Sequence, residues 1–336
     1  MDVRRIEVGE GERLRALRLA ALRDAPGAFA ATAEEDAARP AEHCDMLGGG
    51  PGAVFVAGEW EGMAGIYLDG EQPVLWGMWV APPARGRGLG RALTESVIGW
   101  ARAHGLERLT LSVSDAATAA ERLYEGLGFA RTGAARPLES DPALEQHDLA
   151  LDLHPEPIRI ETERLLLRRW EPDELAALHG LRAREDVVRW LYDPPATEEE
   201  SRARLARRIG DTRFAFSGDA VGLAIVHDGA IAGDISFFLT SAEHRQGEIG
   251  FIVHPDHQGR GYASEATRAL LELGFETFGL HRIAGRAEAR NVASARVLEK
   301  AGMQLEARLV ENELVKGEWQ SELVYAVRQS QSRRRK

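Results

Sequence analysis

The sequence predicts an α/β (α+β) protein with two similar domains in tandem, each built on a mixed central sheet flanked by helices. A glycine-rich box begins at Arg85 in the first half, and a second box begins at Gln258 in the second half. The triplets Leu127-Gly128-Phe129 and Ala301-Gly302-Met303 follow the two boxes at nearly equal separations. Strand-like and helix-like runs surround both boxes in the same order. Landmarks that recur with one spacing indicate a duplicated domain.

Two prolines mark the expected boundary between the domains. They stand in His154-Pro155-Glu156-Pro157, between an apolar run and a new strand, and short proline-containing links commonly separate domains. We therefore expect one domain over residues 1–153 and another over residues 158–329. The remaining residues, 330–336, end in three arginines and a lysine and predict a basic, disordered tail.

The first half reads as a helix, then strands, then a second helix after the box. Leu14, Leu17 and Leu22, with arginines between them, predict an amphipathic helix over 11–22. Short apolar runs bounded by turn residues predict strands, and longer runs with a 3.6-residue period predict helices. Strands are expected over 53–57, 63–68, 74–80 and 109–113, and further helices over 89–104 and 116–126.

The second half repeats this order with variations. A turn at Asp228-Gly229 separates two of its apolar runs, and this dipeptide between strands is a strong hairpin signal. Strands are expected over 164–170, 221–226, 231–239, 247–253 and 282–285. Helices are expected over 172–183, 198–209, 261–278 and 293–300.

Composition excludes several classes of protein. The chain has 336 residues and a net charge of −11, which argues against a basic nucleic-acid-binding face and modestly favours cationic substrates such as amines. It has neither an apolar run long enough to cross a membrane nor an apolar core near its N-terminus, so we expect a cytoplasmic protein. Cys44 is the only cysteine, which excludes an internal disulfide, and no metal site is expected.

The glycine boxes carry the chemical signal. Glycines avoid side-chain clashes and reach positive φ, so consecutive backbone N–H groups can approach an anion at the start of the next helix. A pyrophosphate fits such a loop best. Neither box ends in the Gly-Lys-Ser/Thr of a nucleotide-binding P-loop, and both lie too deep in their domains for a dinucleotide fingerprint. The residues concerned are Arg85, Gly86, Arg87, Gly88, Leu89, Gly90 and Arg91, and then Gln258, Gly259, Arg260, Gly261, Tyr262 and Ala263.

These motifs resemble those of the GCN5-related N-acetyltransferases (GNAT). Residues 78–93 look like the acetyl-CoA signature of that family, and residues 123–129 look like its closing motif. Residues 251–263 give the signature again. Residues 291–302 are similar to the branch that acetylates the N-termini of ribosomal proteins, the RimJ/RimL-like branch.

The resemblance implies a fold and a cofactor. In this family, the strand before the box splays from its neighbour and its backbone holds the pantetheine arm of acetyl-CoA, while the box holds the pyrophosphate. By resemblance, Trp79 and Val80 supply that backbone in the first half, and Ile252 and Val253 supply it in the second. A backbone N–H in this strand is then placed to polarise the thioester carbonyl.

The resemblance also points to catalytic residues. Direct attack by an amine needs a base for the amine proton and an acid for the departing thiolate. In the first half Tyr124 matches the acid, with helix packing as the alternative, whereas the family's cofactor-contacting Asn is replaced by Ala117. In the second half Asn291 matches that Asn, Ser294 is the acid or a helix cap, and Glu248 is a base or a solvated carboxylate. No base is identified in the first half.

We therefore expect an acetyl-CoA-dependent N-acetyltransferase, monomeric or homodimeric, that modifies a primary amine. The acceptor is left open between a small-molecule amine, an antibiotic among them, and a protein N-terminus. The alternative is an acyl-CoA sensor or scaffold, in which one half binds without turnover and regulates the other; the replacement at Ala117 favours it. A nucleotide-binding module is the third reading, and the absent P-loop lysine argues against it.

Overall fold

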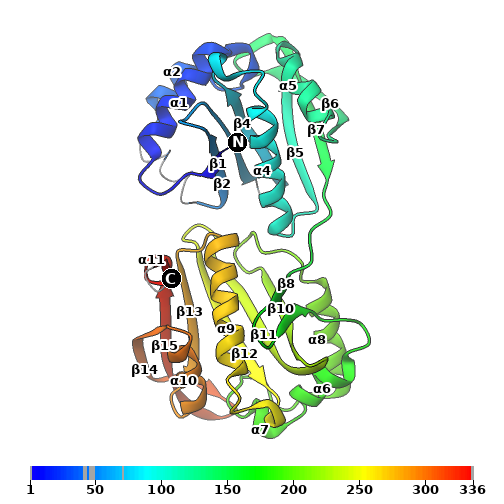
Figure 1. Ribbon diagram of the computed structural model, residues 1–336, viewed down its shortest axis with the longest axis vertical. Coiled ribbons are helices and arrows are strands. Elements are labelled where there is room, and N and C mark those ends of the chain that lie inside the picture. The colour runs from blue at the N-terminus through cyan, green and yellow to red at the C-terminus, as the bar shows by residue number, and fades with distance from the viewer. Residues whose placement is uncertain (1, 41–43, 45–49, 70–71, 334–336) are drawn as a thin grey trace. The chain divides into compact units, whose positions relative to one another are not determined.

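A computed structural model describes residues 2–40, 44, 50–69 and 72–333 of the chain (Figure 1). The chain divides into two compact units, residues 1–156 and 157–336. Each unit has its own mixed sheet flanked by helices, so the expected fold class is confirmed. No helix among the described residues has the length and apolar character that crossing a membrane requires.

The sheet of the first unit has one parallel pair of strands, and that pair is split. β4 and β5 are paired only between Val74 and Thr110, so the two strands diverge on either side of this contact. All other neighbouring strands are antiparallel. The strands, in sheet order, are β1 (Val3–Arg5), β2 (Gly52–Ala57), β3 (Gly62–Asp69), β4 (Gln72–Val80), β5 (Arg108–Ser114), β7 (Asp141–Asp152) and β6 (Ala130–Leu138).

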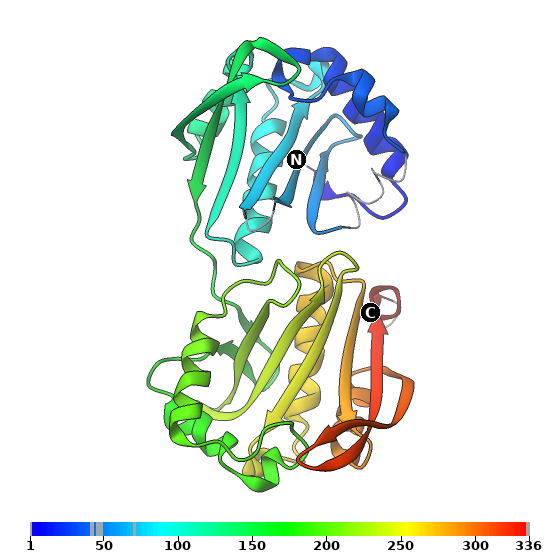
Figure 2. The same ribbon diagram turned by 180° about the vertical axis from the view of Figure 1, so that it is seen from behind.

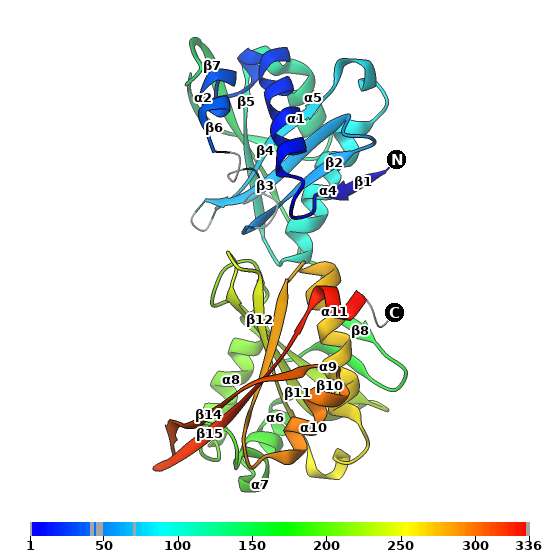
Figure 3. The same cartoon turned by 90° about the vertical axis from the view of Figure 1, so that its left-hand side faces the viewer.

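Helices cover both faces of this sheet. α1 (Gly11–Asp24) packs Leu14 and Leu17 against Val54, Val56 and Trp79, because its leucines recur on one side of the helix. α4 (Leu89–Ala103) lies on the opposite face (Figure 3). The remaining helical segments are η1 (Pro26–Ala28), α2 (Ala33–Ala38), η2 (Pro82–Ala84), η3 (Asp115–Ala117) and α5 (Thr118–Glu125).

The second unit repeats the split parallel pair. Residues 246–249 of β12 pair with residues 282–285 of β13, and the rest of β12 runs on without a β13 partner. The hairpin of β10 and β11 turns at Asp228-Gly229, both with positive φ, as expected for this dipeptide. The strands, in sheet order, are β14 (Gln304–Val315), β15 (Glu318–Arg328), β13 (Arg282–Glu288), β12 (Gln246–Val253), β11 (Ala230–Ser241), β10 (Ala220–His227), β9 (Leu166–Arg169) and β8 (Arg159–Glu161).

Two apolar clusters of the second unit lie on opposite faces of its sheet. Ile249 and Val253 of β12 belong to the cluster beneath α9 (Tyr262–Glu272), whereas Ile252 packs with α6 (Leu175–Arg182) and α8 (Glu198–Gly210). In Figure 2 the strands stand in front of α9. The other helical segments are α7 (Glu185–Val188), η4 (Pro255–His257), the π-helical η5 (Leu273–Thr277), α10 (Val292–Lys300) and α11 (Gln329–Arg333).

Three segments differ from the sequence-based expectation. The helix expected over 261–278 is α-helical only to Glu272 and then widens into a π-turn. The hairpins β6–β7 and β14–β15 were not predicted. β6 exposes both faces and carries no apolar alternation, whereas β14 alternates at Leu305, Ala307 and Leu309 but is mostly exposed. Gln329–Arg333 form the short helix α11 in the segment where we expected no order, and 334–336 lie outside the described residues.

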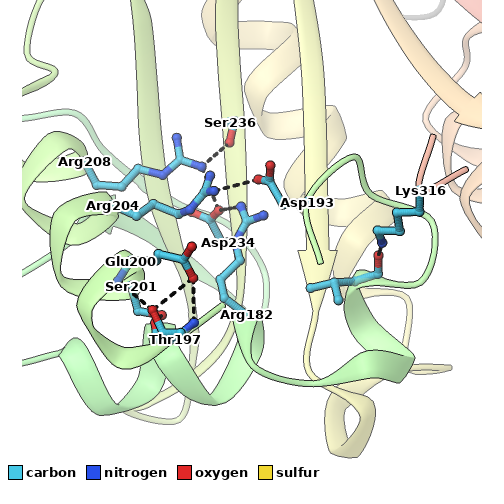
Figure 4. A network of polar contacts seen from close by, with 11 residues as sticks. Arg182, Asp193, Thr197, Glu200, Ser201, Arg204, Arg208, Asp234, Ser236 and Lys316 are labelled. Atoms are coloured by element: carbon cyan, nitrogen blue, oxygen red, sulfur yellow. Dashed lines mark hydrogen bonds and ion pairs between the residues drawn. The ribbon is translucent and has the colours of Figure 1, made fainter. Parts of the chain in front are cut away.

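A buried ionic network joins α6, α8 and β11 (Figure 4). Asp234 is 1% exposed, and it accepts hydrogen bonds from Trp170 Nε1 at 3.0 Å, Arg182 at 3.1 Å and Arg208 at 2.8 Å. Arg208 also donates to Ser236 Oγ at 2.7 Å. Burial alone would raise the pKa of Asp234, but the two guanidinium groups outweigh it and lower that pKa. The network therefore fixes both helices to the sheet as a charged unit.

Asp234→Asn is expected to destabilise the second unit by about 3–5 kcal/mol, because two buried arginines lose their counter-charge. Differential scanning calorimetry should show the unfolding transition of the second unit moving to lower temperature. Asp193→Asn is the matched control, because Asp193 pairs with Arg204 at 2.7 Å but is 59% exposed, and it should cost less than about 1 kcal/mol. Equal effects of the two substitutions would contradict a structural role for the network.

Candidate functional site

Both glycine boxes form the same backbone turn between a strand and a helix. Gly86 and Gly88 have φ of 75° and 80°, and Gly259 and Gly261 have 74° and 85°. Gly88 and Gly261 are the N-caps of α4 and α9, and neither helix start carries a side-chain cap. The first N–H groups of each helix, which have no partner within the helix, are thus left for an external acceptor. This arrangement is an anion-binding site built from backbone.

The side chain of the first residue of each box donates a hydrogen bond to the last carbonyl of the preceding strand. Arg85 Nε donates to Val80 O at 3.0 Å, and Gln258 Nε2 donates to Val253 O at 3.0 Å. The same contact is therefore made by two different side chains. Arg85 also pairs with Asp24. Its guanidinium thus helps to hold the turn, and because the side chain is 51% exposed, its contact with a pyrophosphate stays a prediction.

Asp24, at the end of α1, was missed by sequence reasoning. Its carboxylate accepts a hydrogen bond from Trp79 Nε1 at 2.9 Å and pairs with Arg85. The hydrogen bond from Trp79 and the charge of Arg85 lower the pKa of Asp24, against a smaller effect of burial. Asp24 thereby ties α1 to the end of β4 and to the first box.

Other arginines of the boxes also contact protein groups. Arg87 pairs with Glu61 at 2.8 Å, and Arg91 pairs with Glu95 at 3.2 Å. Arg91 also donates to Gly126 O at 3.3 Å. The side chains of Arg87 and Arg91 are half exposed, so contact of either with a pyrophosphate stays a prediction, as it does for the exposed Arg260.

The second box has a different support, which the sequence analysis also missed. Arg164, before β9, pairs with Glu265 of α9 at 2.6 Å and donates to the carbonyl of Arg260 at 3.0 Å. Its guanidinium lies 5.2 Å from the ring centre of Tyr262. Hydrogen bonds from Thr162 and Arg164 lower the pKa of Glu265 although burial opposes them. Arg164 stands about a hundred positions before Arg260 and Glu265 in the sequence, so no local sequence pattern could reveal these contacts.

The remaining predicted cofactor residues lie around the two turns. Leu89 and Tyr262 are buried as the first residues of α4 and α9. A side chain at Gly90 would begin 3.3 Å from Leu123 Cδ2, so glycine lets α4 approach α5 closely; Ala263 stands in the corresponding place of the second box.

β4 and β12, the strands before the boxes, carry backbone groups where they no longer pair with the parallel strands β5 and β13. The side chains of Trp79, Ile252 and Val253 are buried in the cores, which leaves backbone groups as what these residues offer a ligand; Val80 is half-buried. In β4 a β-bulge precedes Trp79, because Met63 pairs with Trp79 and Gly65 pairs with Trp76. The bulge contains Gly77, with φ of 65°.

Tyr124 of α5 is the predicted acid of the first unit. It is 5% exposed, and its ring meets Phe129 edge-on with centres 5.7 Å apart. Burial raises the pKa of its phenol, so the group stays protonated at neutral pH. The packing and the acid interpretations are both compatible with this position.

Asn291 and Ser294 stand at the start of α10. Asn291 is the N-cap, and its Oδ1 accepts a hydrogen bond from the backbone N–H of Ser294 at 3.2 Å. The alternative that Ser294 caps this helix is therefore wrong. The side-chain amide N–H₂ of Asn291 and the hydroxyl of the half-buried Ser294 stay candidates for the cofactor and for the proton donor.

Glu248 belongs to a row of charges across three strands. Arg286 of β13 donates to Glu248 of β12 at 3.0 Å and to Glu322 of β15 at 2.6 Å, so Glu248 is paired rather than merely solvated. The side chain of Glu322 is 8% exposed. Burial, and then Glu313 and Glu248, raise the pKa of Glu322 more than Arg286 lowers it. Glu322 is thus a second carboxylate with base character, which sequence reasoning missed.

The tyrosine at 192 extends the same group of charges. Tyr192 is 62% exposed, but partial burial of its phenol, contact with Glu313 and the charges of Glu322 and Glu248 raise the pKa of that phenol. Near this group, the Lys316 ammonium donates to the carbonyl of Val188 at 2.8 Å and ties the β14–β15 turn to α7 (Figure 4). Glu248, Arg286, Glu322, Glu313 and Tyr192 together form what we call the carboxylate row.

Among the described residues, one group brings three potential metal ligands together. Atoms of Asp115, Glu145 and His147 lie within 4.8 Å of one another. His147 Nε2 already bonds Asp115 at 2.8 Å, and exposed side chains of this kind commonly pair without an ion. The group therefore does not change the expectation of a metal-free site.

Both units thus share a turn with two left-handed glycines, a helix start without a side-chain cap and a split parallel strand pair, and comparisons with known proteins identify their family. Residues 16–129 match the "Acetyltransferase (GNAT) family", and residues 164–304 match the "Acetyltransferase (GNAT) domain". The chain is 33% identical over 171 residues to the uncharacterized N-acetyltransferase YnaD of Bacillus subtilis, covering 51% of this chain and 96% of that protein.

Two further similarities are found. Spermidine N(1)-acetyltransferase of Vibrio cholerae is 25% identical over 159 residues, covering 46% of this chain and 88% of that protein. A GNAT-family acetyltransferase structure from Bacillus anthracis is 31% identical with a TM-score of 0.47, covering 52% of this chain and 99% of that chain. The chain belongs to the GNAT acetyltransferases and is an N-acetyltransferase with two domains of that family, as the resemblance implied.

Gly88→Ala is expected to destabilise the first unit by about 1–2 kcal/mol, because alanine is strained at a φ of 80°. Gly99→Ala in the same helix is the control: nothing lies within 4 Å of an added Cβ there, and the substitution should stabilise by about 0.5–1 kcal/mol. Calorimetric melting temperatures of the first unit should therefore move in opposite directions. A neutral or stabilising Gly88→Ala would contradict the left-handed turn.

Proposed function

We propose that each domain binds acetyl-CoA at its glycine box and transfers the acetyl group to a primary amine. The observation that carries this proposal is the recurrence, in both units, of an uncapped helix start behind two left-handed glycines beside a split parallel strand pair. Backbone N–H groups and the positive helix end favour a pyrophosphate there. The split offers unpaired strand backbone for an extended arm.

The boxes are open enough for such a group. A Cβ built at Gly86 or at Gly259 meets no atom within 4 Å, so the outer side of each turn is free to receive a ligand. In the second domain Asn291 keeps its side-chain N–H₂ for a ligand while its oxygen caps α10. Acetyl-CoA, when bound, supplies an activated acetyl thioester.

In the second domain the protein groups take the following roles. Glu322, with Glu248 beside it across Arg286, accepts the proton of the acceptor amine, directly or through water. A backbone N–H of β12 near Ile252 and Val253 polarises the carbonyl oxygen. The Ser294 hydroxyl donates a proton to the departing sulfur.

In the first domain Tyr124 is the proton donor to the departing sulfur. Burial raises the pKa of this phenol, so the group is protonated at neutral pH and carries the proton that it donates as the carbon–sulfur bond breaks. β4 carries no carboxylate, and we assign no base to this domain. The backbone of Trp79 and Val80 takes the place of that of Ile252 and Val253.

The carboxylate row favours a positively charged acceptor in the second domain. Glu248, Glu313 and Glu322 outnumber Arg286, and the phenol of Tyr192 extends the group. Relatives include spermidine N-acetyltransferases and a ribosomal-protein acetyltransferase, RimL. A small cationic amine or the N-terminus of a protein is the proposed acceptor class, with the small amine preferred because the row presents several carboxylates together.

The second candidate function is an acyl-CoA sensor, in which the first domain binds without turnover and regulates the second. Two observations favour it: Ala117 replaces the expected cofactor-contacting Asn, and Arg85 is committed to Asp24 and Val80. Binding of acetyl-CoA by the first box without turnover of any amine would support this alternative.

Glu322→Gln is expected to lower kcat/KM of the second domain for polyamines by about 100-fold or more, because an amide cannot take the amine proton. The base must be ionised, so the rate rises as pH increases through the raised pKa of Glu322, and this limb should vanish in the variant. Amine-dependent release of free CoA thiol, followed against pH with spermidine, measures both effects.

Glu318→Gln is the matched control on the same strand, because its carboxylate is 71% exposed and lies 3.7 Å from Arg290. It should leave the rate and its pH profile unchanged. A Glu322→Gln enzyme with the parental rate and profile would exclude Glu322 as the base, while the absence of amine-dependent thiol release from the intact protein would count against the enzymatic proposal itself.

A further inference from the structure

We propose that the first domain selects an amine that also carries a carboxylate, such as an amino acid, and that Arg18 of α1 binds this carboxylate. The inference rests on the proposed acetyl transfer by the first domain and names the acceptor class of that site. It makes the acceptor of the first domain chemically opposite to the cationic acceptor proposed for the second.

The planar guanidinium group of Arg18 lies over two aromatic rings. Its guanidinium carbon lies 5.0 Å from the ring centre of Phe29 and 5.6 Å from that of Trp76. The side chain is 14% exposed, and burial lowers its pKa from the usual value for arginine, with Asp36 partly opposing this. Stacking on aromatic faces orients a guanidinium while leaving its edge N–H groups for a planar anion.

One edge of this guanidinium has no protein partner. Nε lies 3.6 Å from a carboxylate oxygen of Asp36, whereas Nη1 is buried and makes no hydrogen bond within the part of the chain that the structure describes. Buried guanidinium nitrogens are normally satisfied, and a missing partner calls for a specific explanation. A ligand anion at Nη1 is that explanation.

The local charge also favours an anion. Asp36 is shared between Arg18 and Arg39, each at 3.6 Å. Asp36 thus lies near two guanidinium groups, and its contact with Arg18 is at Nε, so Nη1 receives no hydrogen-bond acceptor from it. A carboxylate can accept two parallel hydrogen bonds from a guanidinium, and such pairs are both stronger and more selective than neutral ones.

Arg18 lies over the part of β4 where the reaction is expected. A side chain at Gly77 would begin 3.7 Å from Arg18 Nη1, and Gly77 forms the bulge next to Trp79 and Val80. A group bound to Nη1 therefore lies beside the β4 bulge, two and three residues before the backbone of Trp79 and Val80 that is proposed to polarise the thioester. An acceptor that carries its amine and its carboxylate close together, as an α-amino acid does, suits this arrangement.

The transfer itself is balanced in the usual way. The amine nitrogen forms a bond to the acetyl carbon, the carbon–sulfur bond breaks with its electron pair on sulfur, and the proton lost by the amine is matched by the one that sulfur gains. Arg18 takes no part in these changes; it binds the acceptor and sets its orientation.

The test compares phenylalanine with 2-phenylethylamine, which has the same skeleton without the carboxylate. Gly261→Trp in the full chain silences the second box, so CoA thiol release reports the first domain. We expect kcat/KM to favour phenylalanine at least tenfold. Arg18→Gln should abolish that preference by raising KM for phenylalanine about tenfold or more, with little change for 2-phenylethylamine. Arg23→Gln, on an exposed position of the same helix, is the control and should change neither substrate.

Equal use of the two amines, or equal loss with both in Arg18→Gln, would overturn the inference, as would acetyl-CoA binding without turnover of phenylalanine. Arg18→Lys keeps the charge and should retain part of the preference, which keeps the test informative where Arg18→Gln unfolds. Calorimetric titration of acetyl-CoA into the Gly261→Trp protein distinguishes failure of the proposed function from failure of the Arg18 inference. If acetyl-CoA does not bind, the proposed function of the first domain is contradicted. If acetyl-CoA binds but phenylalanine is not preferred, only the role of Arg18 is contradicted.

Discussion

The strand-to-helix turn with two left-handed glycines is the constraint on which each unit depends. Gly88 and Gly261 start their helices at φ values that other residues adopt only under strain. A side-chain cap at these positions would consume the N–H groups that the turn exposes. The turn also lies at the end of β4 or β12, beyond the point where each strand loses its parallel partner. The anion site and the unpaired strand backbone therefore stand next to each other in both units.

The two halves hold this common backbone with different side chains. In the first unit Asp24 links Trp79 and Arg85, and in the second Arg164 links Glu265 with the carbonyl of Arg260. The contact of Arg85 with Val80 O and of Gln258 with Val253 O is the shared element. A duplicated domain can keep its ligand-binding turn while its supports diverge, because the turn needs only that its ends be fixed.

The acceptor sides differ in charge. The first unit places a partly unsatisfied guanidinium over the bulge of β4, and the second places several carboxylates across β12, β14 and β15 around one arginine. Since acetyl transfer needs only a neutral amine nitrogen at the thioester, the surrounding charges decide which amines reach it. Two domains with opposite local charge are then expected to serve different acceptors.

The sequence was sufficient for the local features and insufficient for the contacts between distant segments. Glycine spacing and apolar periodicity predicted the boxes, the order of most strands and helices, and the two-domain fold, because these depend on neighbouring residues. The hairpins β6–β7 and β14–β15 were missed: β6 and β14 are mostly exposed, although their partners β7 and β15 contribute core residues such as Leu149 and Tyr325. The contacts of Asp24, Arg18 and Glu322 depend on partners far away along the chain, and local pattern could not show that Arg85 pairs with Asp24.

Calorimetric titration of acetyl-CoA is the most direct test of the central claim, which is that both turns are cofactor sites. It should be made on the intact protein and on Gly88→Trp and Gly261→Trp, which fill one turn each. The account predicts two sites in the intact protein and the loss of one site in each variant. A single site removed by only one of the substitutions would contradict the claim for the other domain, and the absence of binding to the intact protein would contradict it for both.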